Sequence, residues 1–328
     1  RDTDRSRGLG DVYKRQPYDI KLPLTIYNTS CYRGIPGKYI AAGPLASRWL
    51  QQQFATDATL IRSGAQVLGE PAAGYLSHPG YAALPKAPYR YQEMLGVIWR
   101  ENPSSYLEDG EQAVLMAALM ETDNAGRPLI DAWIKRSGLS ADAWLEKLFE
   151  ATVIPFYHLL CRYGVALIAH GQNVTLVMKD YVPQRILLKD FQGDMRLVDE
   201  DFPQARSLPE QVKAVTARLS ADYIIHDLQT GNFVTVLRFI SRLTLQCGVS
   251  ETRFYQILAG VLRGYMAAHP DLAERFAKFD LFKPQIIRVI LNPVKLTFSE
   301  HDGGSRMLPN YVTDLDNPLF LVSRESAR

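Results

Sequence analysis

The sequence predicts an α+β fold, with a mixed strand and helix region at residues 17–140 and a mainly helical region at 141–328. Three stretches of alternating apolar residues in the first region are typical of strands, at 20–27, 93–100 and 112–121. In the second region apolar residues recur at helical spacing, at 141–164, 208–220, 231–246, 251–267, 271–278 and 284–292. The length of 328 residues fits about two domains.

The elements of the first region follow from local signals. Pro23 inside 20–27 indicates an edge strand or a bulge, because proline has no N–H to donate to a sheet. Apolar residues on one helical face predict a helix at 44–54. Residues 63–90 are rich in glycine, proline and alanine and are predicted to form an ordered loop, and Asn124–Arg127 a turn.

The second region combines long helices with one hairpin. Its first helix is predicted to end at Gly164 and to kink at Pro155. The short strands Val174–Met178 and Arg185–Leu188 follow, joined by a turn at Asp180–Pro183. Helices on both sides of this hairpin complete the region.

The first sixteen residues stand apart from the rest. The run Asp11–Gln16 looks like the translation of a transposon end used in sequencing libraries. We therefore expect residues 1–16 to be a cloning or assembly scar, joined to the C-terminal part of a longer protein. A mobile basic arm is the alternative, and the segment has no apolar core of a signal peptide.

Composition narrows the class of protein. The net charge is +2, which gives no electrostatic footprint for nucleic acid or for an anionic membrane. The longest apolar stretch, Phe233–Leu245, contains two arginines and is too short to span a bilayer. Three widely spaced cysteines form no disulfide framework and fit a reducing cytoplasm.

Polar residues around the predicted hairpin form the most informative constellation. His170 and Asn173 lie in the loop before it, and Asp190 follows it directly. Because a hairpin returns the chain to its starting point, we expect the three side chains at one end. An amide oxygen and a carboxylate suit Mg²⁺, and protein kinases place an Asn and an Asp in the same order. Isolated residues of these types more simply cap turns, but the ordered set favours a nucleotide-bound metal.

A second polar group lies near the start, at Lys21, Thr29, Ser30, Arg33 and Lys38. Lysine and arginine neutralise phosphate, and hydroxyl groups add neutral donors. A purely structural role for this group is an equal alternative. The same two alternatives hold for Lys295, which follows a predicted helix end and either enters a cleft or is solvated.

Other polar residues carry weaker signals. The cluster of His226, Asp227, Gln229 and Asn232 is interpreted as capping a helix junction rather than as catalytic. No H-E-x-x-H, G-x-S-x-G or Walker-type sequence is present, which disfavours zinc proteases, α/β-hydrolases and P-loop enzymes.

The chain resembles the NRPS-independent siderophore synthetases over residues 18–324. The resemblance is carried by the runs Ile20–Leu22, Tyr27–Lys38, Ala169–Asn173, Lys189–Phe191, His226–Gly231 and Gly303–Tyr311. It implies that 17–140 binds nucleotide phosphate and substrate. It also implies that 141–328 is a kinase-like palm region carrying the catalytic histidine and a metal-binding hairpin.

The resemblance implies an ATP-dependent, AMP-forming ligase that uses ATP and Mg²⁺. A citryl carboxylate attacks the α-phosphate, and the amine of N6-acetyl-N6-hydroxylysine then displaces AMP to form an amide. By the family pattern, the catalytic residues are His170, Arg33 and Lys21. The ATP- and substrate-binding residues are Lys21, Thr29, Ser30, Arg33, His170, Gln172, Asn173 and Lys295, the metal ligands are Asp190 and Asn173, and a homodimer is suggested.

Two departures from the family pattern bear on activity. Many members carry an acidic residue where this chain has Ile168. An N-terminal His-Pro-rich motif and a Ser-x-Arg phosphate contact are also absent, so we expect the chain to be impaired on its own. Two rival functions stay open: a kinase-like phosphotransferase that releases ADP, and a non-catalytic module that binds an iron–siderophore complex.

Overall fold

The computed structural model describes residues 16–28, 31–35, 37–83, 94–191, 193–290 and 310–325. The strands are β1 (Tyr18–Lys21), β2 (Leu24–Asn28), β3 (Cys31–Arg33), β4 (Gln66–Val67), β5 (Ala72–Tyr75), β6 (Gly96–Glu101), β7 (Glu111–Leu115), β8 (Val165–Leu167), β9 (Val174–Lys179), β10 (Val182–Leu188), β11 (Met195–Val198), β12 (Ala217–Leu219), β13 (Gln285–Ile290) and β14 (Asn310–Asp316). The α-helices are α2 (Gly37–Ile40), α3 (Gly43–Thr56), α4 (Ala58–Ser63), α5 (Pro79–Ala82), α7 (Leu129–Ser137), α8 (Ala141–Tyr163), α9 (Glu210–Val215), α10 (Ala221–Ile224), α11 (His226–Leu228), α12 (Arg238–Leu243), α13 (Glu251–Ala268), α14 (Ala273–Lys278) and α16 (Pro318–Glu325). The remaining turns are the 3-10 helices η1 (Pro103–Tyr106), η2 (Met116–Met120), η3 (Pro203–Ala205), η5 (Thr244–Cys247) and η6 (Pro270–Leu272), and the π-helix η4 (Gln229–Leu237). The predicted α+β fold is confirmed.

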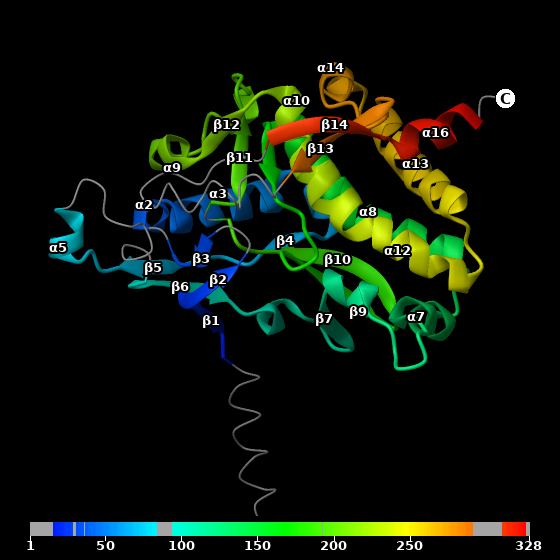
Figure 1. The fold of residues 1–328 in the computed structure, drawn as a ribbon, viewed down its shortest axis with the longest axis horizontal. Helices are drawn as coiled ribbons and strands as arrows, with labels where there is room; N and C mark the ends of the chain where they lie inside the picture. The colour runs from blue at the N-terminus through cyan, green and yellow to red at the C-terminus, as the bar shows by residue number, and fades with distance from the viewer. Residues whose placement is uncertain are drawn as a thin grey trace, which may run out of the picture.

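A small antiparallel sheet with strand order β1-β6-β5 forms one end of the molecule (Figure 1). Its register sets Asp19 opposite Arg100 and Lys21 opposite Ile98. The strand predicted at 20–27 is divided, because the chain leaves β1 before Pro23 and begins β2 after it. The missing N–H of proline explains the break, and β1 is the edge strand that Pro23 indicated.

The predicted hairpin is confirmed and lies inside a second sheet, with order β4-β10-β9-β7. Asp180 and Tyr181 both have positive φ, at 50° and 64°, as a two-residue hairpin turn requires. Arg185 on β10 forms an ion pair with Glu111 on β7 across the intervening strand. The hairpin is thus fixed in the middle of a sheet, and its far end delivers residues 189–191 to the β8–β9 loop.

Helix α8 forms the centre of the main hydrophobic core. Ser140 caps its start by accepting a bond from Ala143 N, and Gly164 ends it with φ 65°. Phe149 makes an edge contact with Phe254 of α13 at 5.0 Å between ring centroids. Figure 1 shows α8, α12 and α13 together on one side of the molecule, above β10. Buried side chains from both sides of residue 140 join this core, and the division of the chain there stays a prediction.

Several sequence-based assignments differ from the structure. The loop predicted at 63–90 contains β4, β5 and α5, and the strand predicted at 112–121 continues as the 3-10 helix η2. The helix predicted at 208–220 is α9 followed by β12. The helix predicted at 284–292 is the strand β13, because it pairs with β14, a partner that lies far along the chain. Within the described ranges, no helix combines the length and apolarity needed to span a bilayer.

Candidate functional site

The loop Ile168–Asn173, hereafter the His170 loop, joins β8 to β9. Its tip is a turn in which Asn173 N donates to His170 O at 2.9 Å. Gly171 O accepts from Ala117 N at 3.0 Å, and a Cβ on Gly171 would lie only 3.0 Å from that nitrogen. A side chain at Gly171 would press on the backbone of η2, so glycine favours this close approach of the loop to η2.

The amide of Asn173 is held in one orientation. Its Nδ2 atom donates to Ile168 O at 3.2 Å and to Asp194 Oδ2 at 3.3 Å, and the residue is buried. Because both acceptors take the amide nitrogen, the Oδ1 atom is the one left to face a cation. Asp194 therefore orients the residue that was predicted to bind metal, a role that the sequence did not reveal.

His170 is neutral in this environment. Burial lowers its pKa, although the nearby carboxylates of Asp194 and Asp190 partly offset the effect. Its Nδ1 atom lies 3.3 Å from Gln172 N and accepts that N–H, which assigns the proton to Nε2. His170 can thus donate one hydrogen bond from Nε2. The side chain of Gln172 is exposed.

Asp190 is the point at which the two predicted polar groups meet. Lys21 Nζ lies 2.5 Å from Asp190 Oδ1, and Arg100 Nη1 lies 3.2 Å from Oδ2. Burial raises the pKa of Asp190, but Lys21 and Arg100 outweigh burial and hold the pKa below its usual value. The backbone of Asp190 is left-handed, with φ 64°. The carboxylate is therefore ionised and bonded to two cations.

Arg100 completes this cation cluster, which we define as Lys21, Arg100 and Lys189. Its guanidinium also reaches Asp19 at 3.4 Å, and its buried Nε has no partner among the described residues. Burial lowers the pKa of Lys189, and the neighbouring Arg100 adds to the effect. Three cations thus face two carboxylates, an excess of positive charge suited to an anionic ligand.

Sequence reasoning missed Arg100 and gave Lys189 no role. An arginine inside a predicted strand of apolar residues was the available signal, since a half-buried guanidinium needs partners. Of the other predicted residues, Thr29, Ser30 and Lys295 lie outside the described residues, and for Arg33 only the backbone in β3 is described.

A magnesium ion fits the donors that are present. In the described part of the chain, no three His, Cys, Asp or Glu side chains gather as a metal site. Mg²⁺ needs only one or two protein oxygens, however, because it keeps waters and binds phosphate. The Oδ1 atom of Asn173 and the carboxylate of Asp190 are oxygen donors of this kind, so the predicted metal role stays a proposal.

The interpretation of the polar residues at 226–232 as helix caps holds for His226, whose Nδ1 lies 3.0 Å from Tyr223 O in the last turn of α10. The starts of α10, α11, η4 and α12 have no side-chain cap. Asn232 instead donates from Nδ2 to Ala169 O at 3.0 Å, directly before His170. Burial raises the pKa of Asp227 to about 7 and lowers that of His226 to about 4. The segment is therefore a buried support behind the His170 loop.

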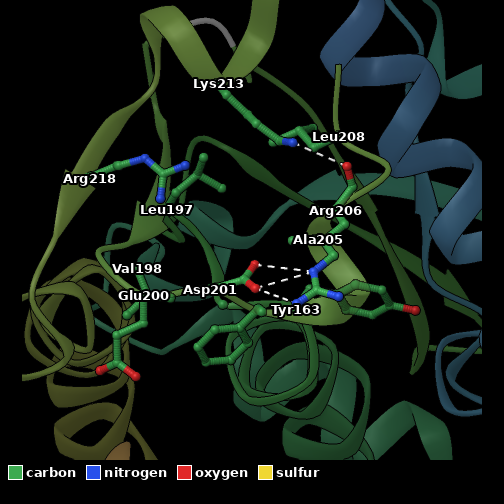
Figure 2. Close-up of a pocket in the computed structure, with 12 residues that line it drawn as sticks. Tyr163, Leu197, Val198, Glu200, Asp201, Ala205, Arg206, Leu208, Lys213 and Arg218 are labelled. Atoms are coloured by element: carbon green, nitrogen blue, oxygen red, sulfur yellow. Dashed lines mark hydrogen bonds and ion pairs between the residues drawn. The ribbon is translucent and has the colours of Figure 1, made fainter. Parts of the chain in front are cut away.

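A separate pocket lies beside β11 and β12, at the C-terminal end of α8 (Figure 2). Its lining includes the aromatic residues Tyr163 and Phe202 and several charged residues. Arg206 is bound by Asp201 at 3.2 Å from Nε, as Figure 2 shows. No residue of the predicted site lines this pocket, so the candidate site is the one around His170 and Asp190.

Comparisons with known proteins identify families and relatives that match this chain. The IucA / IucC family matches residues 7–121, and the family described as ferric iron reductase FhuF-like transporter matches residues 142–305. Aerobactin synthase of Escherichia coli is 70% identical over 97% of this chain and 55% of that protein. Aerobactin synthase of Vibrio mimicus is 59% identical over 95% of this chain and 53% of that protein.

A solved structure of an aerobactin synthetase is also similar to this chain. Aerobactin synthetase IucC from a hypervirulent Klebsiella pneumoniae superposes with a TM-score of 0.81 at 63% identity, covering 94% of this chain and 51% of that one. The chain thus spans about half the length of the curated relatives it matches. On these matches, the chain belongs to the IucA/IucC family of siderophore synthetases.

Proposed function

We propose that this chain carries the catalytic part of an ATP-dependent, AMP-forming acid–amine ligase of hydroxamate–citrate siderophore biosynthesis. One observation carries the proposal: Lys21 and Arg100 of one sheet contact Asp190 beside the His170 loop. This contact gathers positive charge next to a donor histidine and two oxygen donors. The 70% identity to aerobactin synthase supports a citryl carboxylate and N6-acetyl-N6-hydroxylysine as substrates.

In the first step, a carboxylate oxygen of the citryl substrate attacks the α-phosphorus of ATP. The bond from this phosphorus to the bridging oxygen breaks, and diphosphate leaves with the electron pair. Negative charge grows on the leaving diphosphate and has to be met by fixed cations and donors. We assign this role to Lys21, Arg33 and Arg100, with the hydroxyls of Thr29 and Ser30.

His170 acts at the α-phosphate. With Nδ1 occupied by Gln172 N, its Nε2–H donates to a phosphate oxygen without adding a full charge. Asn173 and Asp190 would hold Mg²⁺, which when bound neutralises phosphate charge. If Asp190 held Mg²⁺ in place of its bonds to Lys21 and Arg100, those two cations would be free to bind phosphate.

In the second step, the amine nitrogen attacks the acyl carbon of the adenylate. The C–O bond to the phosphate breaks, AMP leaves with the electron pair, and the nitrogen loses a proton as the amide forms. Lys295 is assigned to carboxylate or phosphate binding. We assign to the half-buried His170 loop the exclusion of bulk water from one side of the adenylate, which limits its hydrolysis.

The test supplies ATP, Mg²⁺, a citrate derivative and hydroxylamine, which traps an acyl-adenylate as a hydroxamate. AMP, diphosphate and hydroxamate are expected, with E. coli aerobactin synthase as the positive control. Because the chain spans about half of that relative, its turnover is expected to be lower. His170→Ala should abolish hydroxamate formation, whereas His78→Ala, a change at an exposed histidine, should not.

The same assay decides between the rival functions. ADP as the product would favour the kinase-like phosphotransferase, which the order of Asn173, hairpin and Asp190 motivates. The FhuF-like match at 142–305 favours an iron–siderophore binding module. That alternative requires iron–siderophore binding without any nucleotide product. A homodimer and a cytoplasmic location also belong to the proposal, and sedimentation of the purified chain tests the first of them.

A further inference from the structure

We propose that Asn232, in the π-helix η4, is a positioning residue that fixes the His170 loop for the reaction. The inference rests on the proposed function and names a part of that site which lies outside its ligand contacts. Three observations carry it: one hydrogen bond, one close approach of two backbones, and a set of buried polar atoms.

The hydrogen bond fixes the peptide that leads into His170. Asn232 is 1% exposed, and its Nδ2 donates to Ala169 O at 3.0 Å. The carbonyl of Ala169 and the nitrogen of His170 belong to the same planar peptide unit. Holding that carbonyl therefore sets the direction in which the His170 side chain leaves the backbone.

The backbones of η4 and the loop also approach closely. A Cβ added to Gly231 would lie 3.3 Å from Ala169 N and 3.9 Å from Ile168 Cγ2. This glycine brings the helix near enough for the short Asn232 side chain to reach the loop. π-Helical turns are rare and occur often at functional sites.

The buried polar atoms argue against a purely structural role. Asp227 Oδ2, Thr230 Oγ1 and Asn232 Oδ1 are buried and have no partner among the described residues. A buried polar group that is left without a hydrogen bond weakens a fold. A segment selected only for packing would carry apolar side chains at these positions, as most buried positions of α8 do.

The experiment compares two substitutions and two controls in the 328-residue chain. Asn232→Leu removes the hydrogen bond, and Gly231→Ala presses a methyl group on the loop while leaving Asn232 in place. The controls are Thr235→Ser, an exposed residue of the same π-helix whose hydroxyl keeps its bond to Gly231 O, and Gly260→Ala, where an added Cβ meets nothing within 4 Å. Amide hydrogen exchange is followed in peptides covering 165–175 and in peptides of α8.

Both substitutions should accelerate exchange in the loop by about tenfold or more and leave α8 unchanged, with no change in the controls. In ATP-dependent AMP formation, kcat should fall about 10- to 100-fold, while KM for ATP changes less than about twofold. The reason is that the loop shifts while Lys21 and Arg100 are untouched.

Two results would overturn the inference: loop exchange that stays at the wild-type rate, or exchange that rises equally in the loop and in α8. Failure of the proposed function is detected separately. In that case the positive control forms AMP and the wild-type chain does not. In that case the exchange data alone decide the role of Asn232.

Discussion

The two regions that meet at Asp190 are stabilised in different ways. Behind β10 and α8 lies a large core in which Trp144 and Leu148 are fully buried. The sheet β1-β6-β5 instead covers a small cluster formed by Ile35, Ile40 and Ile98, and its edge strand exposes Ile20 at 59%. The ion pairs of Asp190 and the hydrogen bonds between Glu101 and Gly69 join this sheet to the hairpin side, and each region should respond differently to substitution.

The largest expected difference is in stability. Leu148→Ala should lower the free energy of unfolding by about 3–5 kcal/mol. The substitution leaves a cavity in a large, well-packed core whose side chains cannot move in to fill it. Ile98→Ala removes a side chain of the same volume from the small cluster and should cost about 2 kcal/mol. Urea denaturation of both variants measures this difference, and equal losses would show that the small cluster is as well packed as the main core.

A substitution on the sheet side should affect ligand binding more than stability. Arg100→Met keeps the aliphatic bulk but leaves Asp190 with Lys21 alone, and KM for ATP should rise about tenfold, a free energy of about 1.4 kcal/mol. Arg206→Met is the matched control, since its partner Asp201 lies in the pocket away from the site. An unchanged KM in the Arg100 variant would remove this arginine from the phosphate site.

Two titratable groups in the buried segment 226–232 should have opposite effects on the pH dependence of stability. His226 has a folded pKa of about 4, so between pH 6.5 and 4 the unfolded chain alone binds its proton and stability falls as pH falls. Asp227 has a folded pKa of about 7, so between pH 3.8 and 7 the folded chain alone holds its proton and stability falls as pH rises. The two effects cancel between pH 4 and 6.5.

Asp227→Asn should remove that cancellation. The free energy of unfolding should then increase with pH from 4 to 6.5, with a slope of up to about 1.4 kcal/mol per pH unit. Thermal or urea unfolding across this range measures the slope in both proteins. A flat profile in the variant would mean that His226 titrates normally.

The smallest effect is expected on the open face of the small sheet. Ile20→Thr replaces an exposed β-branched residue by another and should change stability by less than about 0.5 kcal/mol. Denaturation midpoints of the variant and the wild type provide the check. A loss above about 1 kcal/mol would show that this face is covered in solution.

The order of residues along the sequence was enough to predict one half of the candidate site. His170, Asn173 and Asp190 could be identified because a hairpin between them returns the chain to its start, and the structure contains that hairpin. Arg100 and Asn232 could not be identified in this way. They reach their partners across 90 and 63 residues of chain, and no periodicity encodes such contacts.

The same reason explains the main error in the fold. The apolar residues of 285–290 allow both helical and strand spacing, and the choice is made by pairing with β14. Pro23 and Gly164, by contrast, act through their own backbone, and their effects on β1 and α8 were predictable. The effects of residues such as proline and glycine, which act on the local backbone, are thus predicted from the sequence more reliably than the pairing of distant strands.

The left-handed backbone of Asp190 limits which residues can replace it. At φ 64°, asparagine and glycine are tolerated, whereas valine, isoleucine and threonine clash with their own peptide. Asp190→Asn therefore keeps the shape of the turn while removing its charge. In a saturation library at this position, almost only the asparagine and glycine variants should be folded but inactive. At this position the effect of a substitution on folding can therefore be measured separately from its effect on activity.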